Sequence, residues 1–360
     1  MLALEVNALL NAIARTRAAY GPMPGPAGLP PFRTLRRDGP ATHVIIDSGM
    51  VESILADHRT FLQADIHAAI SAIDSAGALS RIRYFLSHNP IGMNGPAHKE
   101  ARAAFMALFT DASRRLGPAW RAQSGRVFAE AMTGRFGAPV SFARHATDGM
   151  IEVVISHHAP DFPPRRLVDA GKVSARSVFG YVHSLGRLAT EEASLAALSG
   201  DIDLPADAQD SLMPMLLSLL VQGRDPMIGT MAAFLNHLLS LPEPARRNVI
   251  AQASVGEVFR NAAAVNYTGR IAAAAFSRDG LEIAPGEAVL LILSPLGEQA
   301  PVTDLSFGAG RHRCAGKALA YQMLGIWLDD LKLHADALPW QGFVPDIRMP
   351  GVFEDYRPAS

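Results

Sequence analysis

The chain has 360 residues, a formal net charge of −1, 49% hydrophobic and 19% charged residues, and one cysteine. This composition is too apolar for a disordered chain, and a single cysteine excludes a disulfide framework and any all-cysteine zinc or iron–sulfur site. Because the net charge is close to zero, we expect no nucleic-acid partner.

Helical spacing of apolar residues dominates the predicted elements. In chain order they are a short helix over Leu2–Ala19, a Pro/Gly-rich connector over Gly21–Pro31, a strand over His43–Ile46, a helix over Val51–Asp57, mostly helical sequence over 97–260 with breaks near 160–164 and 200–205, a strand over Val289–Leu293 and a helix over Lys317–Leu331. No repeat, linker or alternating strand–helix pattern interrupts this order. We therefore predict one mainly α domain with minor β structure, spanning 1–360.

Neither the N-terminal segment nor the longest apolar stretch indicates a membrane protein. The opening Met-Leu-Ala-Leu-Glu-Val lacks the basic start and apolar core of a targeting segment, so a cytoplasmic location is expected. The longest strongly apolar stretch, Leu212–Val221, contains Pro214 and is about half of the roughly 20 residues that a bilayer requires. We expect no membrane partner.

The most informative segment is Phe307-Gly-Ala-Gly-Arg-His-Arg-Cys-Ala-Gly316, which precedes an amphipathic helix. Its glycines allow a tight turn and a close approach to a flat group. Cys314 then lies near a helix N-terminus, where amide dipoles favour thiolate over thiol. This pattern suits a soft or borderline metal held in a planar macrocycle. The alternative is a buried free cysteine beside a loop.

This segment resembles the haem-binding segment of cytochromes P450, and it matches at Phe307, Gly308, Gly310, His312, Cys314 and Gly316. The resemblance implies the cytochrome P450 fold, with Cys314 as the axial thiolate ligand of the iron of haem b. It also implies that His312 reaches a haem propionate and that Phe307 shields the sulfur.

Three further segments follow the order of the family. Glu257-Val-Phe-Arg260 resembles the Glu-x-x-Arg of its K helix, with both charges on one helical face. Arg270 matches an arginine that contacts a propionate in many bacterial members, and His98 with Arg102 resembles the start of the C helix. By this resemblance His98, Arg102, Arg270 and His312 supply the cations and donors that two haem carboxylates need.

The sequence departs from the family in its long central helix, predicted over Leu212–Leu241. Members usually carry Ala/Gly-Gly-x-Asp/Glu-Thr there, and this chain has Gln222-Gly-Arg-Asp-Pro226. By the resemblance, Gly223 leaves room over the haem and Asp225 matches the family's Asp/Glu. Pro226 stands where the family has a threonine, whose hydroxyl helps to relay protons. Because proline has no N–H, the carbonyl of Gln222 loses its helical partner and the helix is expected to kink. The alternative has Asp225 and Arg224 in ion pairs away from the pocket.

A second departure lies between Gly286 and Phe307, which is shorter than the family's meander and holds no arginine. Glu257 and Arg260 must then find other partners, since a half-satisfied buried network is costly. Arg311, Arg313 and Lys317 form either a docking patch for an acidic ferredoxin or ordinary solubilising charge.

Substrate contacts are expected from apolar segments, with a few polar anchors. These segments and residues are Leu62–Ile91, Phe162–Pro205, Leu216–Gly223, Val265 and Tyr267, with His67, Tyr84 and His88 as anchors.

Three functions remain open. The first is a P450 monooxygenase that oxidises a small, mostly apolar molecule in bacterial secondary metabolism, using O2 and electrons from a ferredoxin and its reductase. The second, motivated by Pro226, is a peroxide-dependent or redox-neutral haem-thiolate catalyst. The third, motivated by the shortened meander, is a non-catalytic haem-binding protein.

Overall fold

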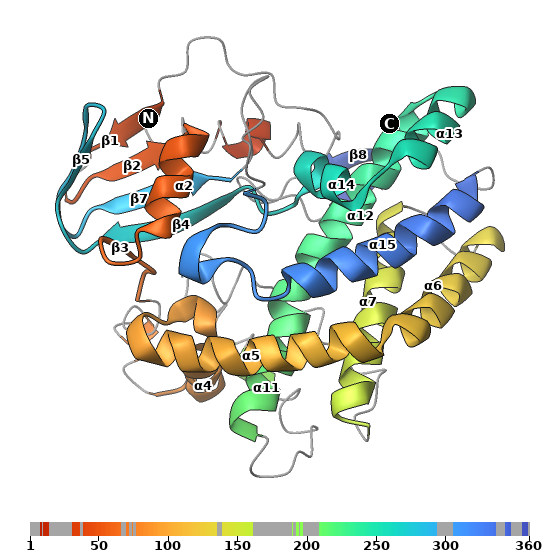
Figure 1. The fold of residues 1–360 in the computed structure, drawn as a ribbon, viewed down its shortest axis with the longest axis horizontal. Helices are drawn as coiled ribbons and strands as arrows, with labels where there is room; N and C mark the ends of the chain where they lie inside the picture. Colours follow the sequence, from red (N-terminus) through yellow and green to blue (C-terminus); the bar gives the residue numbers. More distant parts are fainter. Residues whose placement is uncertain are drawn as a thin grey trace.

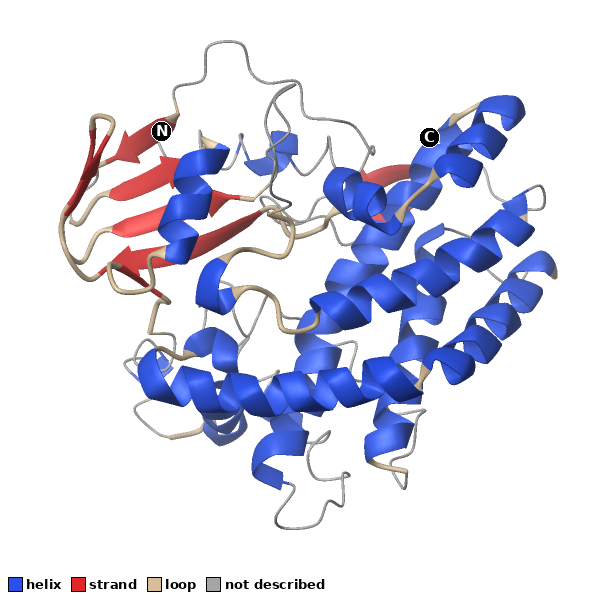
Figure 2. Cartoon of the chain, viewed as in Figure 1, coloured by secondary structure: helices blue, strands red, loops and turns tan. Residues whose placement is uncertain are grey.

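A small sheet lies at one side of the molecule and a larger group of helices fills the other (Figures 1 and 2). The structure, a computed structural model, describes residues 31–36, 39–65, 77–134, 139–160, 209–293, 305–335, 343–346 and 355–358, with scattered positions in 8–13, 70–74 and 189–196. Most of the predicted helix over Leu2–Ala19, the connector over Gly21–Pro31 and the segment Phe162–Pro205 lie outside the described residues. The single-domain organisation stays a prediction.

The main sheet contains both strands predicted from the sequence. Its order is β1 (Phe32–Leu35), β2 (Thr42–Ile45), β7 (Ala288–Ile292), β4 (Tyr267–Ala272) and β3 (Phe61–Leu62), with β2 and β7 parallel and the other pairs antiparallel. Two smaller sheets pair β5 (Phe276–Arg278) with β6 (Leu281–Ile283) and β8 (Phe343–Asp346) with β9 (Asp355–Pro358). The predicted strands over His43–Ile46 and Val289–Leu293 are each correct within one residue.

One helix covers this sheet. Helix α2 (Ser48–Ala56) begins after Asp47, whose side chain accepts a hydrogen bond from the N–H of Met50 at 2.7 Å and so caps the helix. Its apolar face, including Val51 and Leu55, packs with the sheet residue Leu291 in one buried cluster. The Cys314 segment packs against this helix, which is fixed on the sheet.

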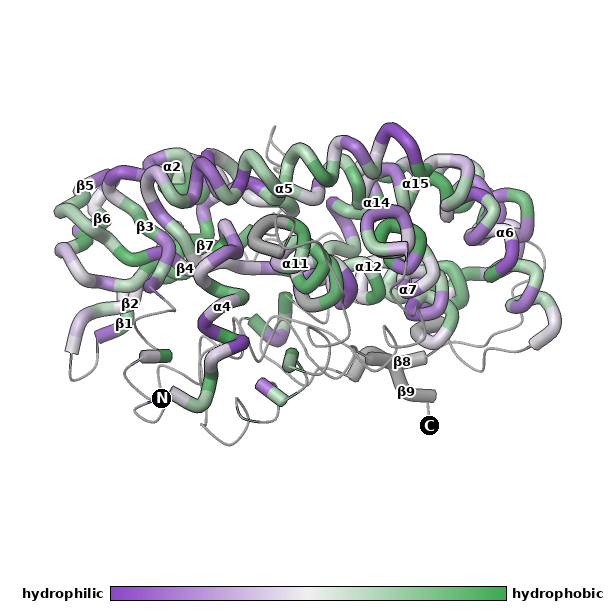
Figure 3. The backbone as a smooth tube through the Cα atoms, turned by 90° about the horizontal axis from the view of Figure 1, so that it is seen from below, coloured by the Kyte–Doolittle hydropathy of each residue, from purple (hydrophilic) through white to green (hydrophobic). Residues whose placement is uncertain are grey.

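The helical part has its core around a long central helix. Its helices are α4 (Ser80–His88), α5 (Gly95–Arg115), α6 (Gly117–Met132), α7 (Pro139–His158), α11 (Gln209–Ser218), α12 (Arg224–Ser240), α13 (Glu243–Gln252), α14 (Val255–Ala262) and α15 (Lys317–Leu333), with short turns η1 (Pro90–Gly92), η3 (Leu219–Gly223) and η4 (Gly310–His312). The outer helices α5, α6 and α15 alternate between hydrophilic and hydrophobic residues (Figure 3), whereas most of α12 is buried. Trp120, Phe142, Phe234 and Trp327 are fully buried between these layers.

The central helix is irregular where the sequence predicts it. Between α11 and α12 the turn η3 is π-helical and ends at Gly223, three residues before Pro226. A π-helical turn is wider than an α-turn and is one of the recognised sites of helix irregularity. The helix is therefore irregular in the turn that precedes Pro226.

Among the described residues, none of the helices combines the length and the apolar character that crossing a membrane requires.

Candidate functional site

The Cys314 segment folds as a compact loop against α2. Gly308 and Gly310 have φ angles of 68° and 66°, and the N–H of Cys314 donates to the carbonyl of Phe307 at 2.8 Å. A Cβ placed on Gly310 would lie 2.3 Å from the carbonyl oxygen of Leu55. Only glycine allows both this backbone conformation and this approach to α2.

Cys314 lies just before α15 and is exposed, although protein groups surround its sulfur. Burial raises the pKa of its thiol, while hydrogen bonds from the N–H groups of Gly316 and Lys317 and the charge of Arg102 act to lower it. The net pKa is raised, so burial outweighs the expected effect of the helix N-terminus. In the free protein Cys314 is a thiol, and a bound metal ion would be needed to hold it as thiolate.

Phe307 packs into an aromatic group on the α14 and α15 side of the loop. Its ring contacts Phe259 edge-on with centroids 4.7 Å apart, and it lies 5.6 Å from the ring of Tyr321. The Nζ of Lys317 lies 5.3 Å from the ring of Phe307 and 5.2 Å from that of Tyr321. This cation–π arrangement holds the loop on α15.

Four basic residues predicted to act together form one cluster. They come from α5 (His98 and Arg102), β4 (Arg270) and η4 (His312). The rings of His98 and His312 lie 4.0 Å apart, and Arg102 and Arg270 both act on the pKa of His312. The fold therefore brings together residues from three separate parts of the sequence.

Among the described residues, no carboxylate offsets the positive charge of the two arginines in this cluster. Burial, followed by the charges of His98, Arg270 and Arg102, lowers the pKa of His312 to about 3, and burial lowers the pKa of Arg270 to about 10. Within the part of the chain that the structure describes, Arg270 donates to Thr268 Oγ1 at 3.2 Å and to the carbonyl of Gly269, and the buried His312 Nδ1 has no hydrogen-bond partner. Among the described residues no carboxylate pairs with Arg102 or Arg270. The site is therefore suited to a ligand that carries more than one carboxylate.

On the central helix, Gly223, Asp225 and Pro226 are half-buried. A Cβ on Gly223 would meet only Leu219, at 3.7 Å, so this turn has space beside it. Arg224 turns the other way, is buried and donates to both oxygens of Asp148 on α7, at 2.8 Å for the pair Nη2–Oδ2. Burial acts to lower the pKa of Arg224, but the bonds to Asp148 outweigh it and the pKa is raised. Asp225 Oδ1 lies 3.9 Å from Arg224 Nη1, so the anticipated ion pair is present, although Arg224 is held mainly by Asp148.

Gln222 connects the π-helical turn to the segment before α5. Its Oε1 accepts from Ser218 Oγ at 2.7 Å and from Asn89 Nδ2 at 3.3 Å, and its Nε2 is buried without a partner. The side chain of Gln222 thus holds the widened turn against Asn89, a contact between segments far apart in sequence that no local motif indicates.

Part of the predicted substrate region can be described. His88 Nδ1 lies 2.8 Å from the carbonyl of Tyr84, so this predicted anchor is engaged within α4. Ile91 and Val265 are exposed apolar side chains in predicted substrate segments, and Tyr267 is half-buried on β4. His67 and nearly all of Phe162–Pro205 lie outside the described residues.

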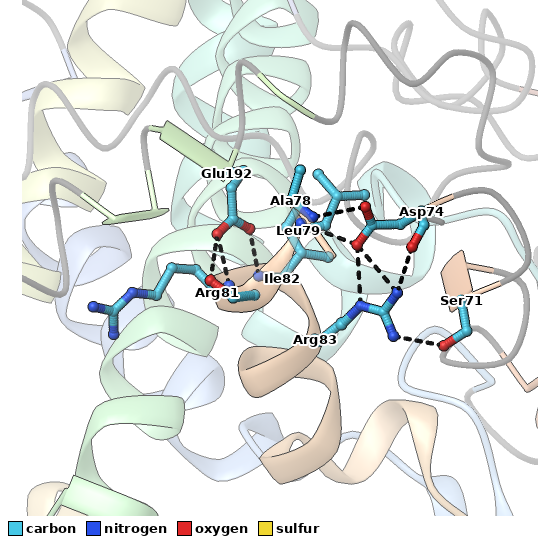
Figure 4. Close-up of polar contacts among 9 residues, drawn as sticks. Ser71, Asp74, Ala78, Leu79, Arg81, Ile82, Arg83 and Glu192 are labelled. Atoms are coloured by element: carbon cyan, nitrogen blue, oxygen red, sulfur yellow. Dashed lines mark hydrogen bonds and ion pairs between the residues drawn. The ribbon is translucent and has the colours of Figure 1, made fainter. Parts of the chain in front are cut away.

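Two carboxylates that the sequence did not single out hold the N-terminus of α4 (Figure 4). Glu192 accepts from the N–H groups of Arg81 and Ile82, at 2.7 and 2.9 Å, and from Ser80 Oγ. Asp74 accepts from the N–H groups before the helix and from the guanidinium of Arg83. Glu192 lies more than a hundred positions from α4 in sequence, so only the fold reveals this contact.

Glu257 and Arg260 do not form a buried network. Both side chains are exposed on α14, where water solvates them, so the cost expected for a half-satisfied buried pair does not arise. The expectation that they need other protein partners is therefore wrong. Arg311 and Arg313 are exposed as well, whereas Lys317 packs on aromatic rings.

No protein-family model matches the sequence, and no curated protein is significantly similar to it. The fold nevertheless matches many solved structures. OxyE, a cytochrome P450 involved in teicoplanin biosynthesis, is 18% identical, with a TM-score of 0.63 over 91% of this chain and 92% of its own. P450BioI, solved with an acylated acyl carrier protein, is 15% identical with a TM-score of 0.68 over 90% and 93%. OxyA from Actinoplanes teichomyceticus is 16% identical with a TM-score of 0.65 over 97% and 96%.

Proposed function

The chain has the cytochrome P450 fold, and on that premise we propose that it is a haem-thiolate oxidoreductase that acts on a small, mostly apolar organic molecule. The observation that carries this proposal is the basic cluster, which has no carboxylate partner among the described residues and whose Arg102 acts on the pKa of Cys314. A planar dianionic group with a metal at its centre fits both features. When bound, haem iron supplies oxygen activation and one-electron chemistry.

Each residue around the proposed haem has a separate task. Cys314 would hold the haem iron as a thiolate, which the N–H groups of Gly316 and Lys317 would stabilise. His98, Arg102, Arg270 and His312 would hold the two propionates, whose negative charge would offset the positive charge of the cluster. Phe307, fixed by Phe259 and Tyr321, anchors the loop whose carbonyl at Phe307 accepts from the N–H of Cys314.

On the central helix, the residues that would be available for proton transfer differ from those expected of a P450. Pro226 offers no hydroxyl, and Gly223 leaves space for the substrate beside the widened turn. We assign proton delivery to the carboxyl group of Asp225, whose side chain is 35% exposed and adjacent to Arg224. The D225N variant should lower turnover, whereas D329N, which changes an exposed carboxylate on α15, should not.

The default reaction is monooxygenation with O2 and electrons from a ferredoxin and its reductase, in bacterial secondary metabolism. Exposed Arg311 and Arg313 supply positive charge for an acidic partner. Pro226 favours a second candidate, a peroxide-dependent or redox-neutral catalyst, because proline lacks the hydroxyl that relays protons in dioxygen chemistry. Turnover that proceeds equally well without reductant or O2 would select this second candidate.

The proposal is tested by optical spectroscopy of the purified haem protein. The ferrous–CO complex should show the red-shifted Soret band of thiolate ligation, and C314S should lose it. The control A315S changes the neighbouring residue and keeps the thiol, so its band should remain red-shifted. An unshifted band in the unmodified protein would refute the haem-thiolate assignment. If no metabolite changes the spin state, the non-catalytic haem-binding alternative is favoured.

A further inference from the structure

A second cluster of metal-binding side chains joins α5 to the end of α7. Asp111 on α5 and the adjacent His157 and His158 in the last turn of α7 each offer a ligand atom, and these atoms all lie within 4.8 Å of one another. His157 Nε2 lies 3.0 Å from Asp111 Oδ2. The helical rise of 1.5 Å per residue places Asp111 about 20 Å along α5 from His98, so this cluster is separate from the basic cluster.

One nitrogen of the cluster is buried without a partner. His158 Nε2 is buried and has no hydrogen-bond partner among the described residues. A buried polar nitrogen of this kind lacks the partner that a cation or water molecule would provide.

Arg115 pairs with only one of the two carboxylate oxygens of Asp111. Arg115 Nε binds Asp111 Oδ1 at 2.7 Å, whereas Asp111 Oδ2 faces His157. The side chain of Arg115 is 68% exposed, so it can move outward when a cation binds. The C-terminus of α7 contributes partial negative charge that favours a cation. These are the charged groups that face the cluster among the described residues.

From this arrangement we infer that Asp111, His157 and His158 bind a divalent cation of the Zn2+ class. Two imidazole nitrogens and one carboxylate oxygen form a common three-residue set for zinc, with water in the fourth position. Mg2+ and Ca2+ prefer oxygen ligands and are disfavoured. The cation takes the place of the proton between His157 and Asp111, and His157 binds through Nε2 as the tautomer protonated at Nδ1. The bound ion links α5 to the end of α7.

Titration calorimetry of the full-length haem protein with Zn2+, after removal of metals with a chelator, tests this inference. One equivalent should bind, and both H157A and D111N should weaken binding at least about tenfold, the size of effect expected for losing a ligand. The matched control is H145A, which changes another histidine of α7, whose Nε2 lies 3.3 Å from Oε2 of Glu130. It should leave the affinity unchanged.

A second measurement keeps the result interpretable if a variant folds poorly. Zn2+ should raise the melting temperature of the unmodified protein and of H145A, but not that of H157A. Because His157 is exposed, H157A should still fold. Mg2+ should raise none of them. The inference is overturned if Zn2+ fails to bind the unmodified protein, or if H157A and D111N retain its affinity. These readouts do not involve the haem, so they are independent of the proposed enzymatic function.

Discussion

Substituting Gly310 by alanine tests why the Cys314 loop requires glycine. A residue with a Cβ in the left-handed region costs about 1–2 kcal/mol, and Gly310 has a φ of 66°. The added Cβ would also lie 2.3 Å from the carbonyl oxygen of Leu55, well inside the 3.0 Å that real Cβ contacts respect. Relieving such overpacking costs about another 1–3 kcal/mol, because backbone must move. The sum is a large fraction of a typical stability of about 5–15 kcal/mol.

Gly308 provides the matched control for this substitution. Its φ of 68° is almost the same, but a Cβ there would find its nearest neighbour, the carbonyl oxygen of His312, at 4.0 Å. G308A should therefore carry only the conformational cost, about 1–2 kcal/mol. Urea unfolding followed by circular dichroism measures both variants, and haem content after purification reports the state of the loop. G310A should be less stable than G308A by about 1–3 kcal/mol and should retain less haem. Equal losses in the two variants would refute the claim that the approach to α2 dictates glycine.

Three further predictions concern polar contacts. D148N leaves the charge of Arg224 buried without its partner and should cost about 3–5 kcal/mol in urea unfolding, a loss that the double variant D148L/R224M should largely restore. E192Q should speed hydrogen exchange of the N–H groups of Arg81 and Ile82, whereas exchange at the far end of α4 should not change. At Asp74, burial acts to raise the pKa, but hydrogen bonds from nearby N–H groups and Arg83 outweigh it and lower the pKa below its ordinary 3.8. Its contribution to stability is present above pH 3.8 and lost as the pH falls through the lower folded value, so the melting temperatures of D74N and the unmodified protein should differ at pH 7 and converge in acid.

Properties that depend on residues close together in the chain could be predicted from the sequence. The spacing of Gly308 and Gly310 before Cys314 indicated a tight loop, and the left-handed φ angles of both glycines are those of such a loop. Short apolar segments predicted the strands near His43 and Val289, the latter after the turn at 284–287, and Pro226 predicted an irregularity in the central helix. In each case the determining interaction is steric or hydrogen-bonded within a few residues.

Properties that depend on contacts between segments far apart in sequence required the tertiary structure. The sequence placed Cys314 at a helix N-terminus, yet burial by other elements raises the pKa of its thiol. It indicated that Glu257 and Arg260 needed partners, yet the fold leaves both in contact with water. Desolvation and exposure are set by the whole fold, and no local pattern encodes them.

The sequence by itself therefore determined the turn chemistry of the Cys314 loop, the order of the basic residues and the loss of the hydroxyl at Pro226. Only the tertiary structure decided that His98, Arg270 and His312 share one site, in which no described carboxylate pairs with Arg270, and that Asp111 meets His157 and His158. The physical reason is that backbone preferences act over a few residues, whereas electrostatic energies depend on distance and burial between segments that the chain keeps far apart in sequence.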